Sequence, residues 1–141
     1  MIRRWSVSIY CHNEHQLLLA RNVATKTWEP LSGRLRRGES PLGAAVRVGH
    51  EHVGRDLYFP PIHQVLGAPQ GLLLYHEYAI DETEARLNFV FLAELSTRDF
   101  KLSPHYDQPS WVHDDHPFNG MPHHVRGTLP FALMAAGLVR P

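Results

Sequence analysis

"GRLRRGESPLGAAVRVGHEHVG", residues 33–54, joins a glycine- and arginine-rich loop to a helix signal with both ends marked. Ser40 can cap the helix by accepting a hydrogen bond from its first turn. Pro41 suits the first helical position, where a missing N–H costs nothing, and Gly54 suits the position after the last helical residue. The stretch therefore predicts a loop followed by a helix over about 41–53.

Helical spacing divides this helix into two sides. One apolar stripe, expected to lie against a sheet, contains Leu42, Ala45, Val46 and Val53. The opposite side is expected to carry Arg47, Val48, Glu51 and His52. Because positions 48, 51 and 52 are three and four residues apart, their side chains are expected to converge on the same side of the helix.

The remaining segments predict a layered domain. Two strands over 4–11 and 16–22 flank the polar turn "HNEH" and read as a hairpin. Further strands are predicted over 28–33, 57–67, 72–80 and 86–95, whereas 109–115 fits either a short edge strand or a loop. A second helix is predicted from about Met121 to Gly137, with a kink or interruption at Pro130. Strands that bracket two helices indicate an α/β or α+β fold.

Length and composition set the class of protein. The 141 residues fit one domain over 1–141, and fourteen basic side chains balance fourteen acidic ones. This balance gives no strong nucleic-acid signal and no attraction to an anionic membrane. Cys11 is the single cysteine, expected to pack in a strand, and the chain has no membrane-length apolar stretch. These features predict a cytoplasmic protein in a reducing compartment.

The loop, the capped helix and the glycine stop together resemble the Nudix box, G-x5-E-x7-R-E-U-x-E-E-x-G-U, where U is aliphatic. The matching positions are Gly33, Glu39, Arg47, Glu51 and Gly54. The departures are Val48, Gly49, His52 and Arg55, which replace Glu, an aliphatic residue, Glu and an aliphatic residue. The approach "WEPLSGRLRRGES" and the tail "GMPHHVRGTLPFAL" are also similar to segments of this family. The resemblance implies an α/β/α sandwich with a mixed sheet between helices.

The resemblance also implies a chemistry. Nudix enzymes hydrolyse a phosphoanhydride bond in a nucleoside diphosphate linked to another moiety, with a divalent metal, Mg²⁺ or Mn²⁺, as cofactor. It implies that Glu51 binds the metal, that Glu39 and Arg47 shape the catalytic site, and that the Gly33 carbonyl completes the coordination. Glu39, a box carboxylate in the loop, either bonds Arg47 or approaches the metal. A homodimer is implied by the resemblance alone.

The departures change what this box can do. Replacing two acids lowers the formal charge of positions 48, 51 and 52 from minus three to minus one, which weakens Mg²⁺ binding. If His52 faces the site, a Glu/His ligand set favours Mn, Co, Ni or Zn. The alternative is that His52 is a solvated surface histidine. Val48 can act neither as a base nor as a ligand, so a catalytic base has to come from elsewhere.

Three groups outside the helix are further candidates, each with a plainer alternative. The segment "HDDH", 113–116, is either a source of a base or a solvated turn. The loop arginines Arg34, Arg36 and Arg37 either bind phosphate without a metal or face solvent. The aromatic residues either stack on a base or lie in the core, and they are Tyr10, Trp28, Tyr75 and Tyr78. His123 and His124 are adjacent, so they cannot form one chelating face of a helix.

Two functions remain open at this point. The first is a Nudix-type hydrolase with an altered metal site. The second is a catalytically impaired Nudix-fold domain that binds a nucleotide or a phosphorylated effector. A divalent ion at Glu51 favours the first, and an ion pair between Glu51 and Arg47 that fills the site favours the second.

Overall fold

Long strands and two helices make up the described part of the chain in a computed structural model, which covers residues 1–62, 67–114 and 120–137. The strands are β1 (Ile2–Asn13), β2 (Gln16–Asn22), β3 (Trp28–Glu29), β4 (Leu31–Arg34), β5 (Leu57–Tyr58), β6 (Leu72–Ala79), β7 (Glu84–Leu95) and β8 (Tyr106–Val112). The helices are α1 (Pro41–Val53) and α2 (His123–Ala135). In this part of the chain, no helix has the length and apolar character needed to cross a membrane.

The strands form one mixed sheet around β1 and β7. These two strands run parallel over a long register, from Ile2 beside Glu84 to His12 beside Glu94. The other pairs are antiparallel: β2 and β4 pair with β1, β5 and β6 pair with β7, and β3 and β8 pair with β2. The β1–β4 pairing sets Gly33 beside Val7 and Arg34 beside Ser6. The loop that leads from β4 to α1 therefore starts beside β1, in the middle of the sheet.

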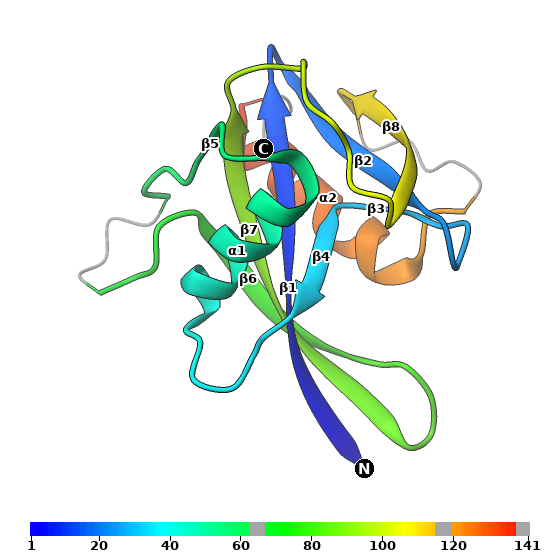
Figure 1. Ribbon diagram of the computed structural model, residues 1–141. Coiled ribbons are helices and arrows are strands. Elements are labelled where there is room, and N and C mark those ends of the chain that lie inside the picture. Colours follow the sequence, from blue (N-terminus) through cyan, green and yellow to red (C-terminus); the bar gives the residue numbers. More distant parts are fainter. Residues whose placement is uncertain (63–66, 115–119, 138–141) are drawn as a thin grey trace.

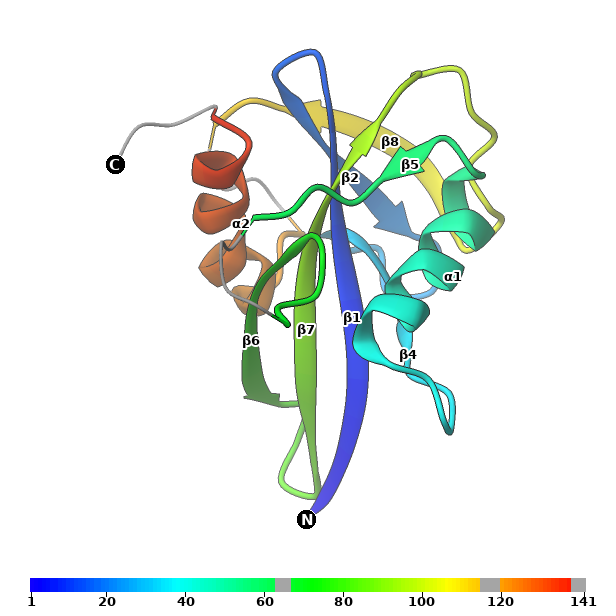
Figure 2. The same cartoon turned by 90° about the vertical axis from the view of Figure 1, so that its left-hand side faces the viewer.

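One helix covers each face of the sheet, as Figures 1 and 2 show. Alternate residues of β1 point to opposite faces, so Val7 and Ile9 pack in the core under α1, whereas Tyr10 packs in the core under α2. Cys11 is buried under α1, as expected of a packed strand residue. The predicted α/β/α sandwich with a mixed sheet is confirmed.

The strand boundaries required some correction. The segment predicted as a strand over 57–67 is a strand only at Leu57–Tyr58, because Pro60 and Pro61 follow and have no N–H for a ladder. Its residues 63–66 lie outside the described residues. Of the two alternatives for 109–115, a strand or a loop, the structure has a strand as far as Val112, because β8 pairs with β2 from Tyr106 to Val112. The segment 28–33 is divided into β3 and β4 at Pro30.

Helix α2 begins at His123 rather than near Met121, and it runs through Pro130 without interruption. Of the two effects predicted for Pro130, a kink or an interruption, the interruption is absent. The carbonyl that loses its partner to Pro130 belongs to Arg126, four residues earlier, and Arg126 is exposed. Solvent can therefore supply the missing hydrogen bond.

Candidate functional site

The loop before α1 folds back on the helix. Gly38 adopts a φ of 85°, which favours glycine, and the Arg36 amide donates to Glu39 Oε1 at 2.7 Å. Ser40 caps the helix, since its Oγ accepts from the Gly43 amide at 3.0 Å. The predicted cap is confirmed, and the turn directs the Glu39 carboxylate towards α1.

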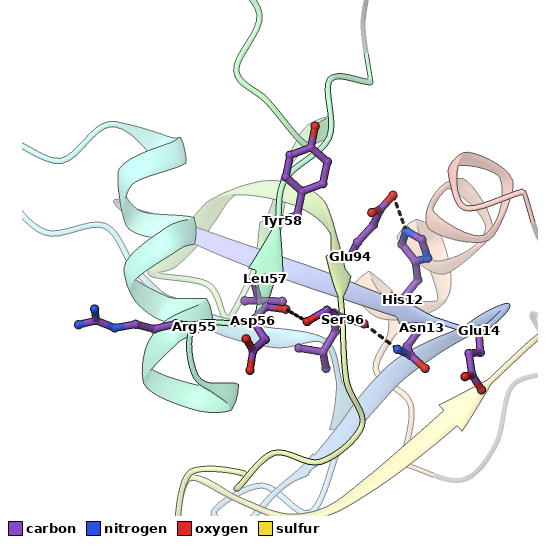
Figure 3. Close-up of a pocket in the computed structure, with 10 residues that line it drawn as sticks. His12, Asn13, Glu14, Arg55, Asp56, Leu57, Tyr58, Glu94 and Ser96 are labelled. Carbon is purple, nitrogen blue, oxygen red and sulfur yellow. Dashed lines mark hydrogen bonds and ion pairs between the residues drawn. The ribbon is translucent and has the colours of Figure 1, made fainter.

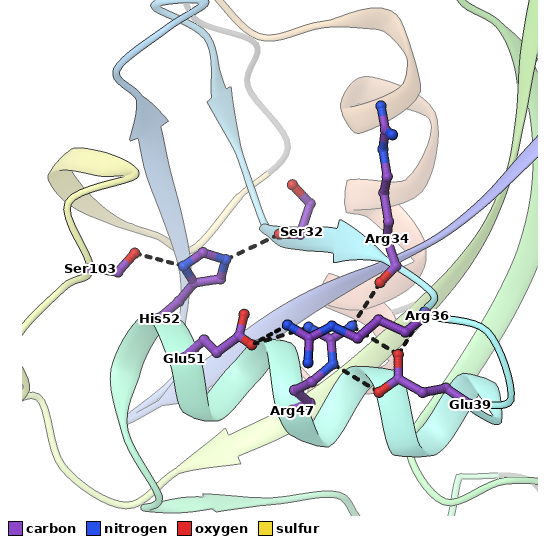
Figure 4. Close-up of polar contacts among 8 residues, drawn as sticks. All are labelled: Ser32, Arg34, Arg36, Glu39, Arg47, Glu51, His52 and Ser103. Carbon is purple, nitrogen blue, oxygen red and sulfur yellow. Dashed lines mark hydrogen bonds and ion pairs between the residues drawn. The ribbon is translucent and has the colours of Figure 1, made fainter.

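Arg47 lies at the centre of a network of ion pairs (Figure 4). Its Nε and Nη2 donate to the two carboxylate oxygens of Glu39 at 2.8 and 2.9 Å, and Nη2 also donates to the Arg34 carbonyl at 2.8 Å. Its Nη1 donates to Glu51 Oε1 at 3.1 Å, and Arg36 Nη2 lies 3.6 Å from the same oxygen. Both box carboxylates that the chain retains are therefore paired with guanidinium groups.

The network changes the acidity of its members. Hydrogen bonds from the Arg47 side chain lower the pKa of Glu39 to about 2, with further help from the Arg36 amide. The same bonds raise the pKa of Arg47 above its ordinary value. Glu39 is thus ionised at any pH near neutrality, and its negative charge is matched by Arg47.

Val48 does not face this network. Its side chain is fully buried, and a Cβ atom placed on Gly33 would lie only 2.6 Å from Val48 Cγ2. The expectation that Val48 and His52 lie on the side of α1 away from the sheet was wrong, because α1 turns both side chains inward and leaves Glu51 half exposed. The predicted apolar stripe was correspondingly incomplete, and the buried residues of α1 are Ala44, Ala45, Val48, Gly49, His52 and Val53.

His52 is a buried histidine held by two hydrogen bonds. Its Nε2 lies 3.1 Å from the Ser32 carbonyl oxygen, which can only accept, so Nε2 carries the proton. Its Nδ1 lies 2.6 Å from Ser103 Oγ and accepts from that hydroxyl. The solvated-surface interpretation of His52 was wrong. Metal ligation by His52 would require one of these bonds to break.

Burial also makes the protonation of His52 unfavourable. Loss of water around the ring lowers the pKa of His52, more than the Ser32 contact raises it. The unfolded chain, with an ordinary histidine pKa of about 6.5, therefore binds more protons than the folded protein below that pH. Stability is expected to be fully present above about pH 6.5 and to fall as the pH drops below it, by at most about 1.4 kcal/mol per pH unit for one such group. Urea unfolding between pH 7.5 and 5 checks this.

The matched variants for this pH prediction are His52→Asn and, at an exposed site, His123→Asn. The decline in stability below pH 6.5 should become shallower in His52→Asn and stay unchanged in His123→Asn. Identical slopes in the wild type and His52→Asn would contradict the assignment.

The residues at this site do not fit the divalent-metal centre that the box resemblance implies. Within residues 1–62, 67–114 and 120–137, no group of three His, Cys, Asp or Glu side chains is arranged to hold a metal ion. Mg²⁺ needs several oxygen ligands in near-octahedral geometry. Here Glu39 and Glu51 are held by guanidinium groups, and Val48 offers no donor.

A cavity of about 530 Å³ opens beside Gly33, between the sheet and the start of α2. Most of its lining is polar and uncharged, and its cations are Arg34 and Arg86. Arg34 points away from the ion-pair network (Figure 4), and Arg86 Nε is buried without a hydrogen-bond partner in the described part of the chain. Glu29 also lines the cavity, and burial raises its pKa.

The sequence did not indicate Arg86, Ser103 or His105 as site residues. They come from β7 and from the segment before β8, more than fifty residues beyond the Gly33 loop. No local pattern marks them, because only strand pairing and helix packing bring Arg86 and His105 to the cavity and Ser103 to His52. Of the loop arginines, Arg37 is exposed and lines none of this cavity.

Other sequence candidates lie apart from the site. His113 is exposed and Asp114 is partly buried, with His113 Nε2 and Asp114 Oδ2 3.6 Å apart, while Asp115 and His116 lie outside the described residues. Tyr10 is a core residue, with its hydroxyl 2.7 Å from Thr128 Oγ1. The alternative of a core position was the correct one for Tyr10.

A further cavity, of about 440 Å³, lies where α1 ends and β5 begins (Figure 3). Its lining includes Tyr58 and the pair His12 and Glu94, whose atoms Nε2 and Oε1 are 3.6 Å apart. Arg55, the last box position, belongs to this cavity, and its side chain points away from the other labelled residues. This cavity shares no lining residue with the one beside Gly33.

The fold can be compared with solved structures. The chain is similar to a Nudix family hydrolase from Clostridium perfringens, at 17% identity and a TM-score of 0.78, over 98% of this chain and 99% of that chain. A possible asymmetric diadenosine tetraphosphate hydrolase from Jonesia denitrificans matches at 16% identity and a TM-score of 0.73, over 100% and 99% of the chains. A MutT Nudix hydrolase from Burkholderia pseudomallei matches at 16% identity and a TM-score of 0.69, over 99% of each chain.

The chain has the Nudix fold. Neither a protein-family model nor a curated protein matches its sequence. The solved structures extend over nearly the whole chain, so the loop and helix at 33–54 correspond to a segment of the Nudix fold and are not an isolated pattern. Within this fold the departures at Val48 and His52 are packed into the core beneath α1.

Proposed function

We propose that this protein is a Nudix-fold domain that binds a nucleotide or another small phosphorylated molecule, with little or no metal-dependent hydrolysis. The observation that carries the proposal is the ion pair of Arg47 with Glu51, to which Arg36 adds a second guanidinium. A dication at Glu51 would have to displace both cations. The carboxylate thus serves the structure of the loop and helix.

The cavity beside Gly33 supplies the binding site in this proposal. Its volume of about 530 Å³ lies within the usual range for small-molecule sites, about 300–1,000 Å³. Arg34 and Arg86 provide guanidinium groups, which bind phosphate oxygens through paired hydrogen bonds without a metal. None of the ion pairs found among the described residues involves Arg34, so its charge is available to an anion.

Hydrolysis is the second candidate, and the fold favours it, because the similar structures are named as hydrolases. In that case Glu51, Glu39 and Arg47 would form the catalytic site, with Glu51 and the Gly33 carbonyl as metal-binding groups. Glu51 would first have to leave Arg47 and Arg36. Manganese is then the better test metal than magnesium, because the site has lost carboxylates.

Binding is tested by calorimetry with pyrophosphate and ADP. Arg34→Ala is expected to lower the affinity for pyrophosphate and for ADP by about tenfold or more, because a hydrogen bond to a charged group contributes about 1.5–3 kcal/mol. Arg37→Ala, which removes the same charge three residues after the end of β4 but outside the cavity lining, should change affinity little. Equal effects of the two substitutions would indicate a diffuse charge effect and contradict the site.

Hydrolysis is tested in parallel by product release from nucleoside triphosphates, nucleotide sugars, ADP-ribose and dinucleoside polyphosphates, with Mg²⁺ or Mn²⁺. The expected result is no turnover above the level of Glu51→Gln. Turnover in the wild type that disappears in Glu51→Gln would reverse the order of the two candidates.

A further inference from the structure

The outer edge of β6 is unpaired in the described part of the chain. β6 pairs with β7 on one side, and no described strand pairs with it on the other. Figure 2 shows β6 at the border of the sheet, next to α2. An exposed strand edge is a template for pairing with another strand, and proteins usually protect it with charges, proline or a covering element. Glu77 is the single Asp, Glu, Lys or Arg residue of β6, so this protection is slight.

The ladder between β6 and β7 determines which backbone groups face outward. The Ile80 amide donates to the Glu84 carbonyl at 2.9 Å, in register with the pairs of the two strands. In an antiparallel ladder every second residue exchanges both of its hydrogen bonds with the partner strand, so Tyr78 and His76 also bond to β7. The residues of β6 whose N–H and C=O groups point away from β7 are therefore Tyr75, Glu77 and Ala79.

The surface of α2 beside this edge lacks the charges of an ordinary surface helix. Arg126 is the single Asp, Glu, Lys or Arg residue of α2, whereas a helix that faces water normally has charged residues on its outer side. Phe131 is 55% exposed and lines a groove of about 610 Å³ between α2 and β6. The other exposed positions of α2 are His123, Gly127, Met134 and Ala135. The strand edge and the helix beside it thus form one surface suited to contact with protein.

We infer that two copies of this chain form a dimer in which β6 pairs antiparallel with β6 across a two-fold axis and α2 packs against α2. The inference is independent of the proposed function. A second copy fits because the outward N–H and C=O groups alternate, so a two-fold axis pairs both edges through the same contacts. Fourteen basic and fourteen acidic residues give each copy no net charge, so two copies do not repel each other.

Charge selects the register of this pairing. A register shift between Leu72 and Leu74 limits the regular part of β6, and an axis at His76 or at Glu77 keeps the pairing within it. An axis at Glu77 would set two carboxylates directly opposite each other, which is destabilising. An axis at His76 sets Glu77 opposite Tyr75 of the second copy. The dimer therefore has its axis at His76.

This register is tested by cross-linking through His76→Cys. The two copies of residue 76 form a non-hydrogen-bonded pair, with Cα atoms about 4.5 Å apart, and a disulfide spans about 4.4–6.8 Å between Cα atoms. Cys11 is buried, so the new thiol is the reactive one. Mild oxidation of dilute His76→Cys should give a disulfide-linked dimer. Glu82→Cys, an exposed position in the turn between β6 and β7, is the control and should stay unlinked.

The contact of α2 is tested by sedimentation. The wild type is expected to sediment with the mass of two chains, and Phe131→Glu to raise the dissociation constant of the dimer by about tenfold or more, because it buries an unpaired charge in each copy. Tyr58→Glu is the matched control, since Tyr58 is also 55% exposed but lies on β5. It should leave the dimer intact.

Amide hydrogen exchange tests the strand pairing directly. In the wild type the outward amides of Tyr75, Glu77 and Ala79 should exchange slowly, and in the Phe131→Glu monomer they should exchange fast. The amides of His76 and Tyr78 bond to β7 and should be slow in both proteins.

A wild type that stays monomeric at every concentration overturns the dimer, in which case a different molecule or solvent covers this edge. A dimer that survives Phe131→Glu, or one in which the outward amides exchange fast, overturns the interface. A dimeric His76→Cys protein that forms no disulfide overturns the pairing across His76.

Discussion

Val48→Glu, which restores the acid that the Nudix box specifies, is expected to destabilise the protein by about 3–5 kcal/mol and to create no metal centre. Val48 is fully buried, and its Cγ2 closes the space over Gly33. A carboxylate at this position has no cationic partner in the core and would lose its water, which is the costly case of an uncompensated buried charge.

Urea unfolding at pH 7 measures this effect, with Val48→Gln and Val48→Ala as controls. Val48→Gln has the size of glutamate without its charge, and Val48→Ala removes packing alone at a cost of about 2 kcal/mol. The destabilisation should be largest for glutamate. A Val48→Glu protein as stable as the wild type, with newly acquired Mn²⁺ binding, would show that α1 can turn this side chain to the site.

Arg47→Ala is expected to lower the free energy of unfolding by about 1–2 kcal/mol. The effect is modest because solvent partly screens the ion pairs of Arg47 with Glu39 and Glu51. Arg47 donates hydrogen bonds to Glu39, Glu51 and the Arg34 carbonyl. Removing its side chain therefore breaks the hydrogen bonds that hold the loop before α1 against the helix. The released carboxylates are also expected to bind Mn²⁺ more strongly than in the wild type. Urea unfolding and calorimetry with MnCl₂ measure the two effects.

Arg47→Lys and Arg37→Ala complete this comparison. Lysine keeps the charge but cannot form the paired hydrogen bonds to Glu39, so it should fall between the wild type and Arg47→Ala. Arg37 is exposed, and its removal should change stability by less than about 0.5 kcal/mol. A loss of stability in Arg37→Ala equal to that in Arg47→Ala would contradict the network as a structural element.

Features with local causes could be predicted from the sequence. Helix α1 begins at Pro41 and ends at Val53 as predicted, because the Ser40 cap and the Gly54 stop act on the backbone next to them. The hairpin of β1 and β2 follows equally from its short polar turn. The bond between Glu39 and Arg47 is one of the two alternatives that the sequence left open for Glu39.

The sequence-based predictions failed where the position of a residue depends on contacts with residues far away along the chain. The face of α1 that packs on the sheet depends on the side chains of β1 and β4 beneath it, so the inward position of Val48 and His52 did not follow from helical spacing. The hydrogen bond between His52 and Ser103 spans 51 residues, and no pattern around either residue indicates it. The extent of α2 through Pro130 likewise depends on a carbonyl that solvent can reach.

By itself, the sequence determined the resemblance to the Nudix box, the ends of α1 and the layered fold, because caps, turns and alternating apolar residues act over a few neighbouring positions. Only the tertiary structure decided that the retained acids are neutralised by Arg47 and Arg36 and that Val48 is buried. It alone placed Arg34 and Arg86 in the lining of one cavity. Which charges are paired and which side chains are buried depends on groups that strand pairing and helix packing bring together. The separation of these groups along the chain does not predict either property.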